Sequence, residues 1–416
     1  MGMHLDLLND DLLELILLRL DSPICLVGAA AVCKRWRRVI AGDGGAFLRR
    51  IRSLQRPPNP IVYGHYSSGN YVSYDSYRHQ QMGDKLVPFF LPTPASIATG
   101  IGENRHFSPD FLDSYDEIID SCGSLLLLRK HKHSFLGITV YEPLTRQCRI
   151  VNPVTLPPDL QYYTIWCAYL LPGDDADATN ASMSNFRVVC TFHDIRDRDL
   201  HAGVLMVSGH NGVDIIPGQI TRLERNQYPM MIEEYFIGRA GASLHWVNND
   251  GVIHVLDGIT METSSFMFPD MAMWNSSTGR YFGVGRQRSR AIRVVDCGGG
   301  AARIVCFAGH DHVVVFARPA RGEWALEKSF RLQEWQWQEG YYCRFLSKFA
   351  SMVAAGEGFV LFAPTEFCQW VFHIDLETEV ITLKLNGGIY SAGLLFPCEL
   401  PWPPHIRACV EHANGN

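Results

Sequence analysis

The sequence lacks any C-x-x-C pair, although its 416 residues include 12 cysteines. The cysteines stand singly along the chain, from Cys25 and Cys33 onward. Structural zinc modules are usually built from closely spaced cysteine pairs, so this spacing argues against one. We therefore expect no metal or other cofactor, and we interpret the cysteines as free thiols in a reducing compartment.

A secretory signal and a membrane span are also lacking. The early leucine run, Leu12–Leu20, follows acidic residues and is interrupted by Glu14 and Arg19, whereas a signal peptide begins with basic residues. The longest uncharged apolar stretch, Ile24–Cys33, is about half as long as a membrane-spanning helix. We expect a protein of the cytoplasm, the nucleus or both, with no membrane partner.

Familiar catalytic motifs are missing as well. The sequence contains no G-x-S-x-G nucleophile elbow, no H-E-x-x-H helix and no G-x-x-x-x-G-K phosphate loop. Two histidine pairs, His131/His133 and His310/His312, could each present two metal ligands on one face of a strand. Neither pair has a cysteine or carboxylate cluster beside it, so we expect ordinary histidines and a protein that is not an enzyme.

A surplus of basic charge is missing overall, since 43 acidic residues outnumber 37 basic ones and the net charge is -6. This balance argues against a protein that coats nucleic acid. One segment reverses it: between Lys34 and Arg56 the only acidic residue is Asp43. Three interpretations remain open, namely a solvated helix face, a surface that attracts an acidic partner, and a nuclear import or nucleic-acid patch.

What the sequence does contain is a compact helical segment near its N-terminal end. Apolar residues recur at helical spacing after the capping residue Asn9. Ser22 and Pro23 predict the start of a second helix. A third helix and a final helical stub are predicted before and after the glycine-rich break at residues 42–45.

This segment is both small and unusually apolar. About 45 residues bury too little surface to be comfortably stable alone. Leu15 and Leu18 also lie off the main apolar stripe of the first helix, so more than one face is apolar. Such a module is expected to complete its core against another protein or, as the alternative, against the rest of its own chain.

The same segment resembles the F-box. Residues 8–20 (LNDDLLELILLRL) and 31–40 (AVCKRWRRVI) match the family's leucine-proline-aspartate start, its I-L-x-R-L helix and its valine–cysteine–basic–x–tryptophan signature, in order and spacing. The sequence from Ala29 to Trp36 is similar to that of plant F-box proteins. One position departs from the pattern, because Asn9 stands where the family usually has proline.

The resemblance implies a substrate-recruiting subunit of an SCF-type (Skp–cullin–F-box) ubiquitin ligase, which binds a Skp-type adaptor through the F-box and a target protein through another domain. The residues that would hold the module together or face the adaptor are Leu8, Leu12, Leu13, Ile16, Leu17, Leu20, Pro23, Val32, Cys33, Trp36 and Ile40. Large desolvated side chains carry most interface energy, so we expect Trp36, Leu12 and Leu13 to be the anchors.

The remaining sequence predicts a large all-β domain. We place the F-box domain at residues 1–55, a proline-containing linker or irregular segment at 56–85, and the β domain at 86–405. From about Leu86 onward, short β-type runs alternate with turn residues. A single sandwich seldom needs so many residues, whereas blades of about 45 residues would give six to eight of them, so a β-propeller is the predicted architecture.

Two recurring patterns support a repetitive β domain. An apolar residue, then Asp, Glu or Asn, two further residues and Thr, recurs at Tyr141–Thr145, Leu256–Thr260, Trp274–Thr278 and Ile374–Thr378. The acidic or amide side chain is expected to accept hydrogen bonds from turn amides at the end of a strand. A glycine followed by a strand with an aromatic residue also recurs, at Gly241–Trp246 and Gly358–Phe362. Residues 121–128 and 142–158 are similar to parts of plant F-box-associated domains.

Target binding is the least determined part of the prediction. The aromatic residues Trp335, Trp337, Tyr341 and Tyr342, beside acidic neighbours, are the candidate target-binding patch. The alternative is that these rings belong to the core of the β domain. Two other functions also remain open: an F-box scaffold that acts outside degradation, and a glycan- or metabolite-binding propeller to which the F-box is an appendage.

Overall fold

The structure is a computed structural model of the chain. It describes residues 9–42, 45–54, 61–67, 89–93, 107–110, 112, 116–130, 138–151, 163–173, 181–194, 199–206, 214–215, 221–225, 236–248, 250–274, 291–297, 301–308, 312–318, 323–331, 351–356, 358–363, 371–385, 395–400, 402–404 and 406.

Four short helices form the N-terminal part, the helical module: α1 (Asp10–Leu17), α2 (Pro23–Val32), α3 (Lys34–Ala41) and α4 (Ala46–Leu54). They confirm the three predicted helices and the final stub. The helices enclose a small apolar core in which Leu26, Ile40 and Ile51 are fully buried. Within the described residues, no helix combines the length and the apolar character that crossing a bilayer requires.

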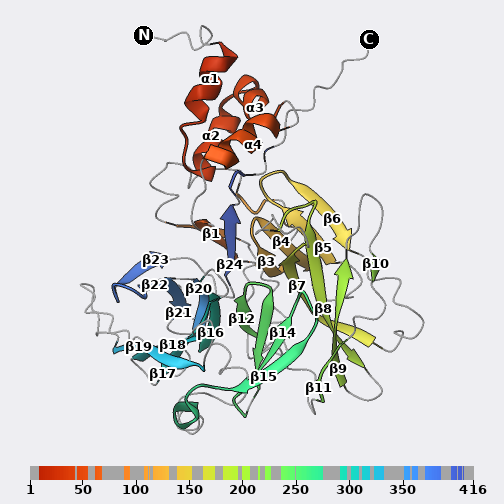
Figure 1. Ribbon diagram of the computed structural model, residues 1–416, viewed down its shortest axis with the longest axis vertical. Helices are drawn as coiled ribbons and strands as arrows, with labels where there is room; N and C mark the ends of the chain where they lie inside the picture. The colour runs from red at the N-terminus through yellow and green to blue at the C-terminus, as the bar shows by residue number, and fades with distance from the viewer. Residues whose placement is uncertain are drawn as a thin grey trace, which may run out of the picture.

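Strands form most of the other described residues, which confirms the predicted mostly β domain (Figure 1). They are β1 (Ile61–Ser67), β2 (Phe89–Pro92), β3 (Asp116–Cys122), β4 (Leu125–Lys130), β5 (Ile138–Glu142), β6 (Gln147–Val151), β7 (Tyr163–Pro172), β8 (Phe186–Asp194), β9 (Asp199–Met206), β10 (Asp214–Ile215), β11 (Thr221–Arg225), β12 (Phe236–Ala240), β13 (Ser243–Val247), β14 (Val252–Asp257), β15 (Thr263–Met267), β16 (Ile292–Asp296), β17 (Ala302–Ala308), β18 (His312–Arg318), β19 (Ala325–Arg331), β20 (Ser351–Gly356), β21 (Phe359–Ala363), β22 (Val371–Asp375), β23 (Ile381–Leu385) and β24 (Phe396–Leu400).

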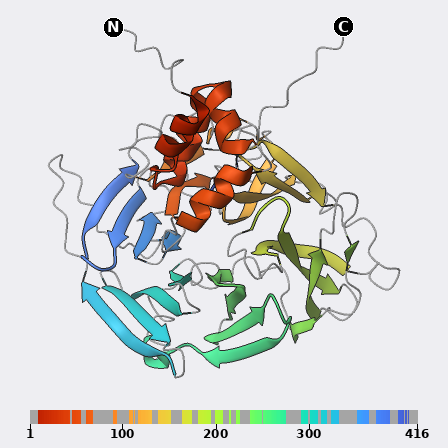
Figure 2. The same cartoon turned by 45° about the horizontal axis from the view of Figure 1, so that its top comes forward.

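The strands are grouped mainly as antiparallel meanders in chain order. β3–β6 and β20–β23 form four-stranded sheets, β7–β11 form another sheet, and β12–β15 and β16–β19 join into one sheet of eight strands. A last sheet has the order β2-β1-β24. Figure 2 shows these sheets following one another around a common centre, with the helices above one part of the circle.

The pairing of β1 with β24 joins the two ends of the β domain. Ile61 lies opposite Leu400 and Tyr66 lies opposite Phe396. The strand β1 differs from the expectation for residues 56–85, which were predicted to be a linker or irregular. Residues 63–67 are all buried, so the alternation of buried and exposed side chains that marks a half-buried strand is absent from this part of the sequence.

The turn predicted from the apolar–Asp–x–x–Thr pattern is confirmed at two sites. Asp257 Oδ1 accepts hydrogen bonds of 2.8 and 2.9 Å from the amides two and three residues further along. Asp375 Oδ1 accepts bonds of 2.9 and 2.8 Å from the corresponding amides. The residue four positions after each aspartate has a positive φ, 59° at Met261 and 61° at Glu379. The two turns therefore share one backbone geometry.

The copy at Tyr141–Thr145 has the same positive φ, 55° at Arg146, but a different set of side-chain hydrogen bonds. Glu142 accepts hydrogen bonds from the hydroxyls of Thr145 and Ser124. Trp274 lies at the end of a short helical turn instead of at the end of a strand. The rest of that copy, residues 275–278, lies outside the described residues.

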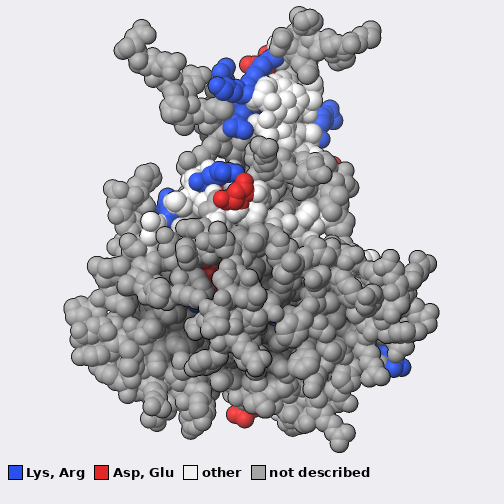
Figure 3. Space-filling view, turned by 180° about the vertical axis from the view of Figure 1, so that it is seen from behind, with Lys and Arg blue, Asp and Glu red and all other residues white. Residues whose placement is uncertain are grey.

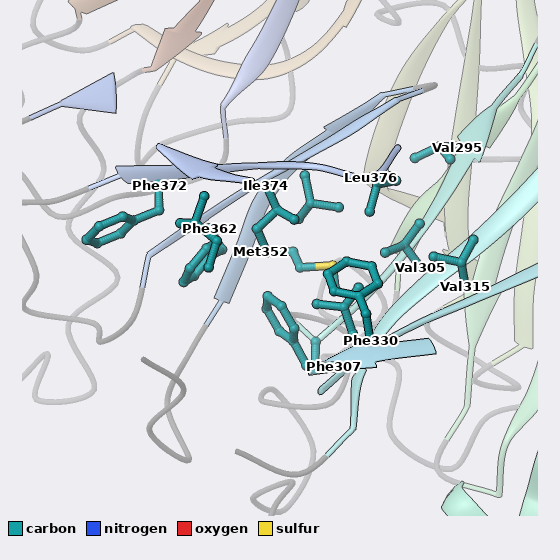
Figure 4. Packing of buried hydrophobic residues seen from close by; sticks show 14 residues of the cluster. Val295, Val305, Phe307, Val315, Phe330, Met352, Phe362, Phe372, Ile374 and Leu376 are labelled. Carbon is teal, nitrogen blue, oxygen red and sulfur yellow. The ribbon is translucent and has the colours of Figure 1, made fainter. Parts of the chain in front are cut away.

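The core of the β domain lies largely between neighbouring sheets. One cluster contains Val305, Phe307 and Val315 of the β16–β19 meander together with Phe362 and Phe372 of the β20–β23 sheet (Figure 4). The rings of Phe307 and Phe362 meet edge to face, with centroids 5.6 Å apart. Burial of these aromatic and branched side chains between sheets is the main stabilising contribution.

One glycine permits a close approach between two meanders. Gly238 of β12 pairs in parallel with Val294 of β16, which makes the junction within the eight-stranded sheet. Its φ is +132°, and a Cβ atom there would lie 2.4 Å from the Val294 carbonyl oxygen. A side chain would therefore force these two strands apart.

Candidate protein-interaction surface

Helix α1 presents apolar side chains on two faces because of where it begins. Asn9 is the N-cap, and its Oδ1 accepts a 2.8 Å hydrogen bond from the Leu12 N–H. With this start, Leu13 and Leu17 point into the helical core and are each 1% exposed. The remaining apolar residues of α1 therefore lie on the side away from that core.

An exposed apolar surface, the outward face, is formed by α1 together with the junction of α2 and α3. Its residues are Leu12, Leu15, Ile16, Val32 and Cys33. The first three are 51%, 52% and 49% exposed, and Val32 is 62% exposed. The ion pair between Arg35 Nε and Asp10 Oδ1, 2.9 Å long, holds the start of α3 beside the start of α1. Exposed apolar groups gathered on so small a module are typical of a binding surface.

The structure divides the predicted adaptor-binding residues into two groups. Those buried in the helical module are Leu13, Leu17, Pro23 and Ile40, and Leu20 and Trp36 are partly buried against its core. Those on the outward face are Leu12, Ile16, Val32 and Cys33. Leu8 lies outside the described residues. Leu13, expected to be an anchor, is thus a core residue, while Leu15, absent from the predicted set, is exposed.

Several residues of the basic run have contacts inside the module. Arg35 pairs with Asp10 as described, and Arg50 Nη1 lies 2.9 Å from Glu14 Oε1. Arg37 Nε donates a 3.0 Å hydrogen bond to the Ala30 carbonyl oxygen. Figure 3 shows Lys and Arg side chains beside uncharged surface on the helical module. Part of the basic run is therefore used to connect helices, and such exposed pairs contribute little stability individually.

The opposite side of the module, the inward face, consists of Ile24, Cys25 and Val27 of α2. It packs into one apolar cluster with residues of β1, β4 and β24, namely Tyr63, Tyr66, Leu126, Leu128, Cys398 and Leu400. Part of the surplus apolar surface predicted for this module is thus covered by its own chain.

A hydroxyl group from the β domain completes the start of helix α2. Ser22 is the N-cap by position, but its side chain makes no capping hydrogen bond. The Tyr63 hydroxyl accepts a hydrogen bond from the Ile24 amide and lies 3.3 Å from Ser22 Oγ. Burial raises the pKa of Tyr63. The tyrosine of β1 therefore satisfies an amide that the helix itself leaves unpaired.

A buried polar cluster of the β domain connects three of its sheets. Arg239 of β12 forms an ion pair with Asp120 of β3 and donates to the carbonyl oxygen of Leu170 in β7. Asp120 Oδ2 also accepts a 2.7 Å hydrogen bond from the Leu170 amide. Burial raises the pKa of Asp120, and Arg239 opposes that rise. Because the buried Asp120 carboxylate accepts from both Arg239 and the Leu170 amide, the cluster is interpreted as a structural contact between sheets.

Glu399 of β24 lies near the same cluster. Its pKa is raised to about 7, mainly by burial; Arg239 opposes the rise and Asp296 of β16 adds to it. The four charged residues Asp120, Arg239, Asp296 and Glu399 each lie close to the C-terminal end of their strands. These strands therefore end at the same side of the β domain. Leu400 contacts the inward face, so this is the helix-facing end.

Potential metal ligands do not gather in the part of the chain that the structure describes. Among those residues, no group of three or more His, Cys, Asp or Glu side chains could hold a metal ion. Burial lowers the pKa of His65 to about 3 and that of His245 to about 4, so both rings are neutral at physiological pH. His131, His133 and His310 lie outside the described residues.

The predicted target-binding aromatics, Trp335, Trp337, Tyr341 and Tyr342, also lie outside the described residues. The place where that segment begins is defined. Within the β16–β19 meander, Asp296 pairs with Ala302 and Ala302 with Arg318, whereas His312 pairs with Arg331. Arg331 therefore ends β19 at the side opposite to Asp296, away from the helix-facing end.

Residues 5–44 match the family model of the F-box domain. The chain thus carries an F-box domain, a module that generally binds Skp-type adaptors within SCF ubiquitin ligases. No curated protein matches the chain.

Solved structures resemble it only weakly. A crystal structure of BBS1N in complex with ARL6DN, soaked with lead, is 12% identical over 69% of this chain and 77% of that one, with a TM-score of 0.32. The mercury-soaked crystal of the same complex is 13% identical over 69% of this chain and 76% of that one, with a TM-score of 0.32. A crystal structure of the Mitotic Checkpoint Complex is 8% identical over 63% of this chain and 62% of that one, with a TM-score of 0.26.

Proposed function

We propose that this protein is a non-catalytic, substrate-recruiting subunit of an SCF-type ubiquitin ligase, in which the outward face binds a Skp-type adaptor. The observation that carries the proposal is the coincidence of two features. The F-box match at residues 5–44 covers the helices that display Leu12, Leu15, Ile16, Val32 and Cys33 to solvent. Other subunits would supply the chemistry, and this chain would hold a target lysine close to the ubiquitin carrier.

Within the outward face, the α1 residues Leu12, Leu15 and Ile16 are the proposed anchors. Each is about half exposed when the chain is alone, so each has apolar area to lose on binding, which is the largest favourable contribution at an interface core. Trp36, partly buried against the helical core, supports this surface from beneath. The basic residues of α3 and α4 would speed association with an acidic adaptor surface.

The test is a triple variant, Leu12→Ala, Leu15→Ala and Ile16→Ala, in the full chain with a purified Skp-type adaptor. Alanine favours helix, so α1 is expected to remain folded while affinity for the adaptor falls at least a hundredfold, about 3 kcal/mol. A matched control replaces three similarly exposed residues of the β domain, Ile150, Ile259 and Leu326, with alanine. Wild-type protein that fails to bind the adaptor, or a triple variant that binds normally, would refute the proposal.

Assembly into a ligase requires a second measurement. We propose that the adaptor-bound protein recruits a cullin, in the cytoplasm, the nucleus or both. Co-purification of the cullin with wild-type protein, and its loss with the triple variant, is the expected result. Adaptor without cullin would instead indicate a scaffold that acts outside degradation.

The β domain is proposed to be a six-bladed propeller of the kind associated with plant-type F-box proteins. The support is the succession of meanders β3–β6, β7–β11, β12–β15, β16–β19 and β20–β23, with a sixth sheet closed by β1 and β24. An experimental structure with a different number of meanders around the centre would overturn this architecture.

Target binding is proposed at the end of the β domain opposite the helical module, where β19 ends at Arg331 and the segment with Trp335, Trp337, Tyr341 and Tyr342 begins. Replacing these four aromatics with alanine is expected to remove client proteins that accumulate with wild-type protein when the proteasome is inhibited. Adaptor binding should be unchanged in the same samples. An unaltered client set would show that this segment does not select targets.

A further inference from the structure

The chain segment after the last strand returns to the helical module. Trp402 packs against the helical core, and Ile406 packs against both that core and the cluster of the inward face. Pro404, between them, is buried. We name these residues, together with Pro403, the C-terminal strap. In Figure 1 β24 points toward the helices, which is the direction in which the strap continues.

The strap is connected to the module from the same sheet that supplies Tyr63. Leu400, just before the strap, pairs with Ile61 of β1, and Tyr63 is two residues further along β1. Tyr63 bonds to the first turn of α2, while Trp402 and Ile406 reach the core that α1, α2, α3 and α4 share. Contacts from both ends of the β domain thus converge on one small helical module.

We propose that the C-terminal strap is a positioning element for the outward face: it holds the four helices in the arrangement that displays Leu12, Leu15 and Ile16. The strap is outside the matched residues 5–44 and at the other end of the sequence. It packs against the core residues of the module, so its effect on a partner of the outward face is transmitted through helix packing.

The physical reason is the size of the module. A bundle of about 45 residues buries too small a fraction of its surface to be rigid without further contacts. Leu13 and Leu17, on the inner side of α1, belong to the same cluster that Trp402 and Ile406 pack against. Loosening this cluster frees α1 to shift, and ordering α1 again on binding would weaken the affinity for any partner of the outward face.

The proposal is tested in the full chain with the double variant Trp402→Ala, Ile406→Ala and two measurements. Hydrogen exchange of amides in α1–α4 is expected to be at least tenfold faster than in wild type, while exchange in β12–β19 stays unchanged. Affinity for a purified Skp-type adaptor is expected to fall about tenfold. If the exchange rates and the affinity both stay within twofold of wild type, the proposed role of the strap is refuted.

A matched control removes a tryptophan and an isoleucine from the β domain, Trp324→Ala with Ile259→Ala, and should leave exchange in α1–α4 unaltered. If the control also accelerates helical exchange, the strap has no special role. If the double variant loses protection throughout the chain, the milder Ile406→Val decides: faster exchange confined to the helices supports the strap, and none refutes it. The adaptor measurement rests on the proposed function, but the exchange measurement does not. A wild-type protein that fails to bind the adaptor therefore refutes that function and leaves the strap testable.

Discussion

The inward and outward faces of the helical module contain the same kinds of side chain but differ in what lies against them. Ile24 and Val27 pack on strands of the β domain, whereas Leu12 and Ile16 remain about half exposed. Apolar residues within 20 positions of one another in the sequence therefore have two different surroundings, the β domain and the solvent. Only the part that the chain leaves uncovered is evidence for an external partner.

The comparison also explains why the two alternatives derived from the sequence are compatible. The module completes its core against its own chain through α2, as one alternative expected, and α1 still offers an apolar surface, as the other expected. A chain in which α2 were exposed and α1 covered would have the same composition. The position of β1 and β24 beside α2 decides between them.

The largest effect is expected from breaking the inward face. Ile24→Ala should lower the free energy of unfolding by about 2–4 kcal/mol, because Ile24 is 2% exposed and its loss leaves a cavity. Leu15→Ala on the outward face should change it by less than about 0.5 kcal/mol. Denaturant unfolding of both variants measures the difference. Equal losses for the two would show that the faces are not distinct.

A pH dependence is expected from Glu399, which lies between Cys398 and Leu400 of the cluster that covers the inward face. Its pKa in the folded chain, about 7, is above the ordinary value of 4.5. The contribution of the protonated Glu399 carboxyl to the free energy of unfolding is therefore fully present below about pH 4.5, and it is lost as the pH rises through 7. Glu399→Gln should remove this loss, on the order of 1–2 kcal/mol after allowance for partial solvent access.

The measurement is the free energy of unfolding between pH 5 and 8, in wild type and in Glu399→Gln. The groups that face this carboxyl are Arg239, Asp296, Cys122 and Cys398. The result therefore tests their combined electrostatic effect on the pKa of Glu399. Identical slopes for the two proteins would contradict the raised pKa.

A smaller effect is expected from the hydroxyl that caps α2. Tyr63→Phe leaves the Ile24 amide without its acceptor and should lower the free energy of unfolding by about 1 kcal/mol. Hydrogen exchange should accelerate in α2 in particular. The control is Tyr169→Phe, which removes a hydroxyl bonded to Trp246 Nε1 at 3.3 Å inside the β domain. If exchange in α2 is also faster in the control, the effect is not specific to the Tyr63 hydroxyl.

The smallest effect is expected at the start of the outward face. Asn9→Ala removes the side-chain cap on the Leu12 amide, which costs about 0.5–1 kcal/mol at an exposed helix end. Adaptor affinity should fall only a few-fold, because the anchors of α1 stay in place. Unfolding curves and adaptor titration test this together. A loss as large as that of the triple variant would mean that Asn9 itself contacts the partner.

The sequence predicts the helices and many strands well, but it does not predict which faces are covered. The spacing of Leu12, Leu13, Ile16 and Leu17 indicates a helix, and hydrophobic periodicity cannot tell which apolar residue faces a core and which faces solvent when both sides are apolar. Leu13 was therefore expected to be an anchor, and Leu15 was not selected. The contacts of α2 with β1 and β24 depend on residues far away in sequence.

Strand prediction shows the same limit. The glycine–aromatic pattern at Gly241–Trp246 predicted a strand there, and the structure has β13 at Ser243–Val247. The strand β1 was not predicted because its side chains from 63 to 67 are buried on both faces. The turn at Asp257 was predictable because its hydrogen bonds are local, within three residues.

The pairing of β1 with β24 has a consequence for the order of synthesis. The helical module leaves the ribosome first, whereas β24 and the strap are made more than 330 residues later. At translation rates of about 5–20 residues per second, β24 follows the helices by roughly 20–70 s, whereas β1 and β4 are made earlier. During that interval the cover of the inward face is incomplete, and the synthesis of β24 completes the difference between the two faces.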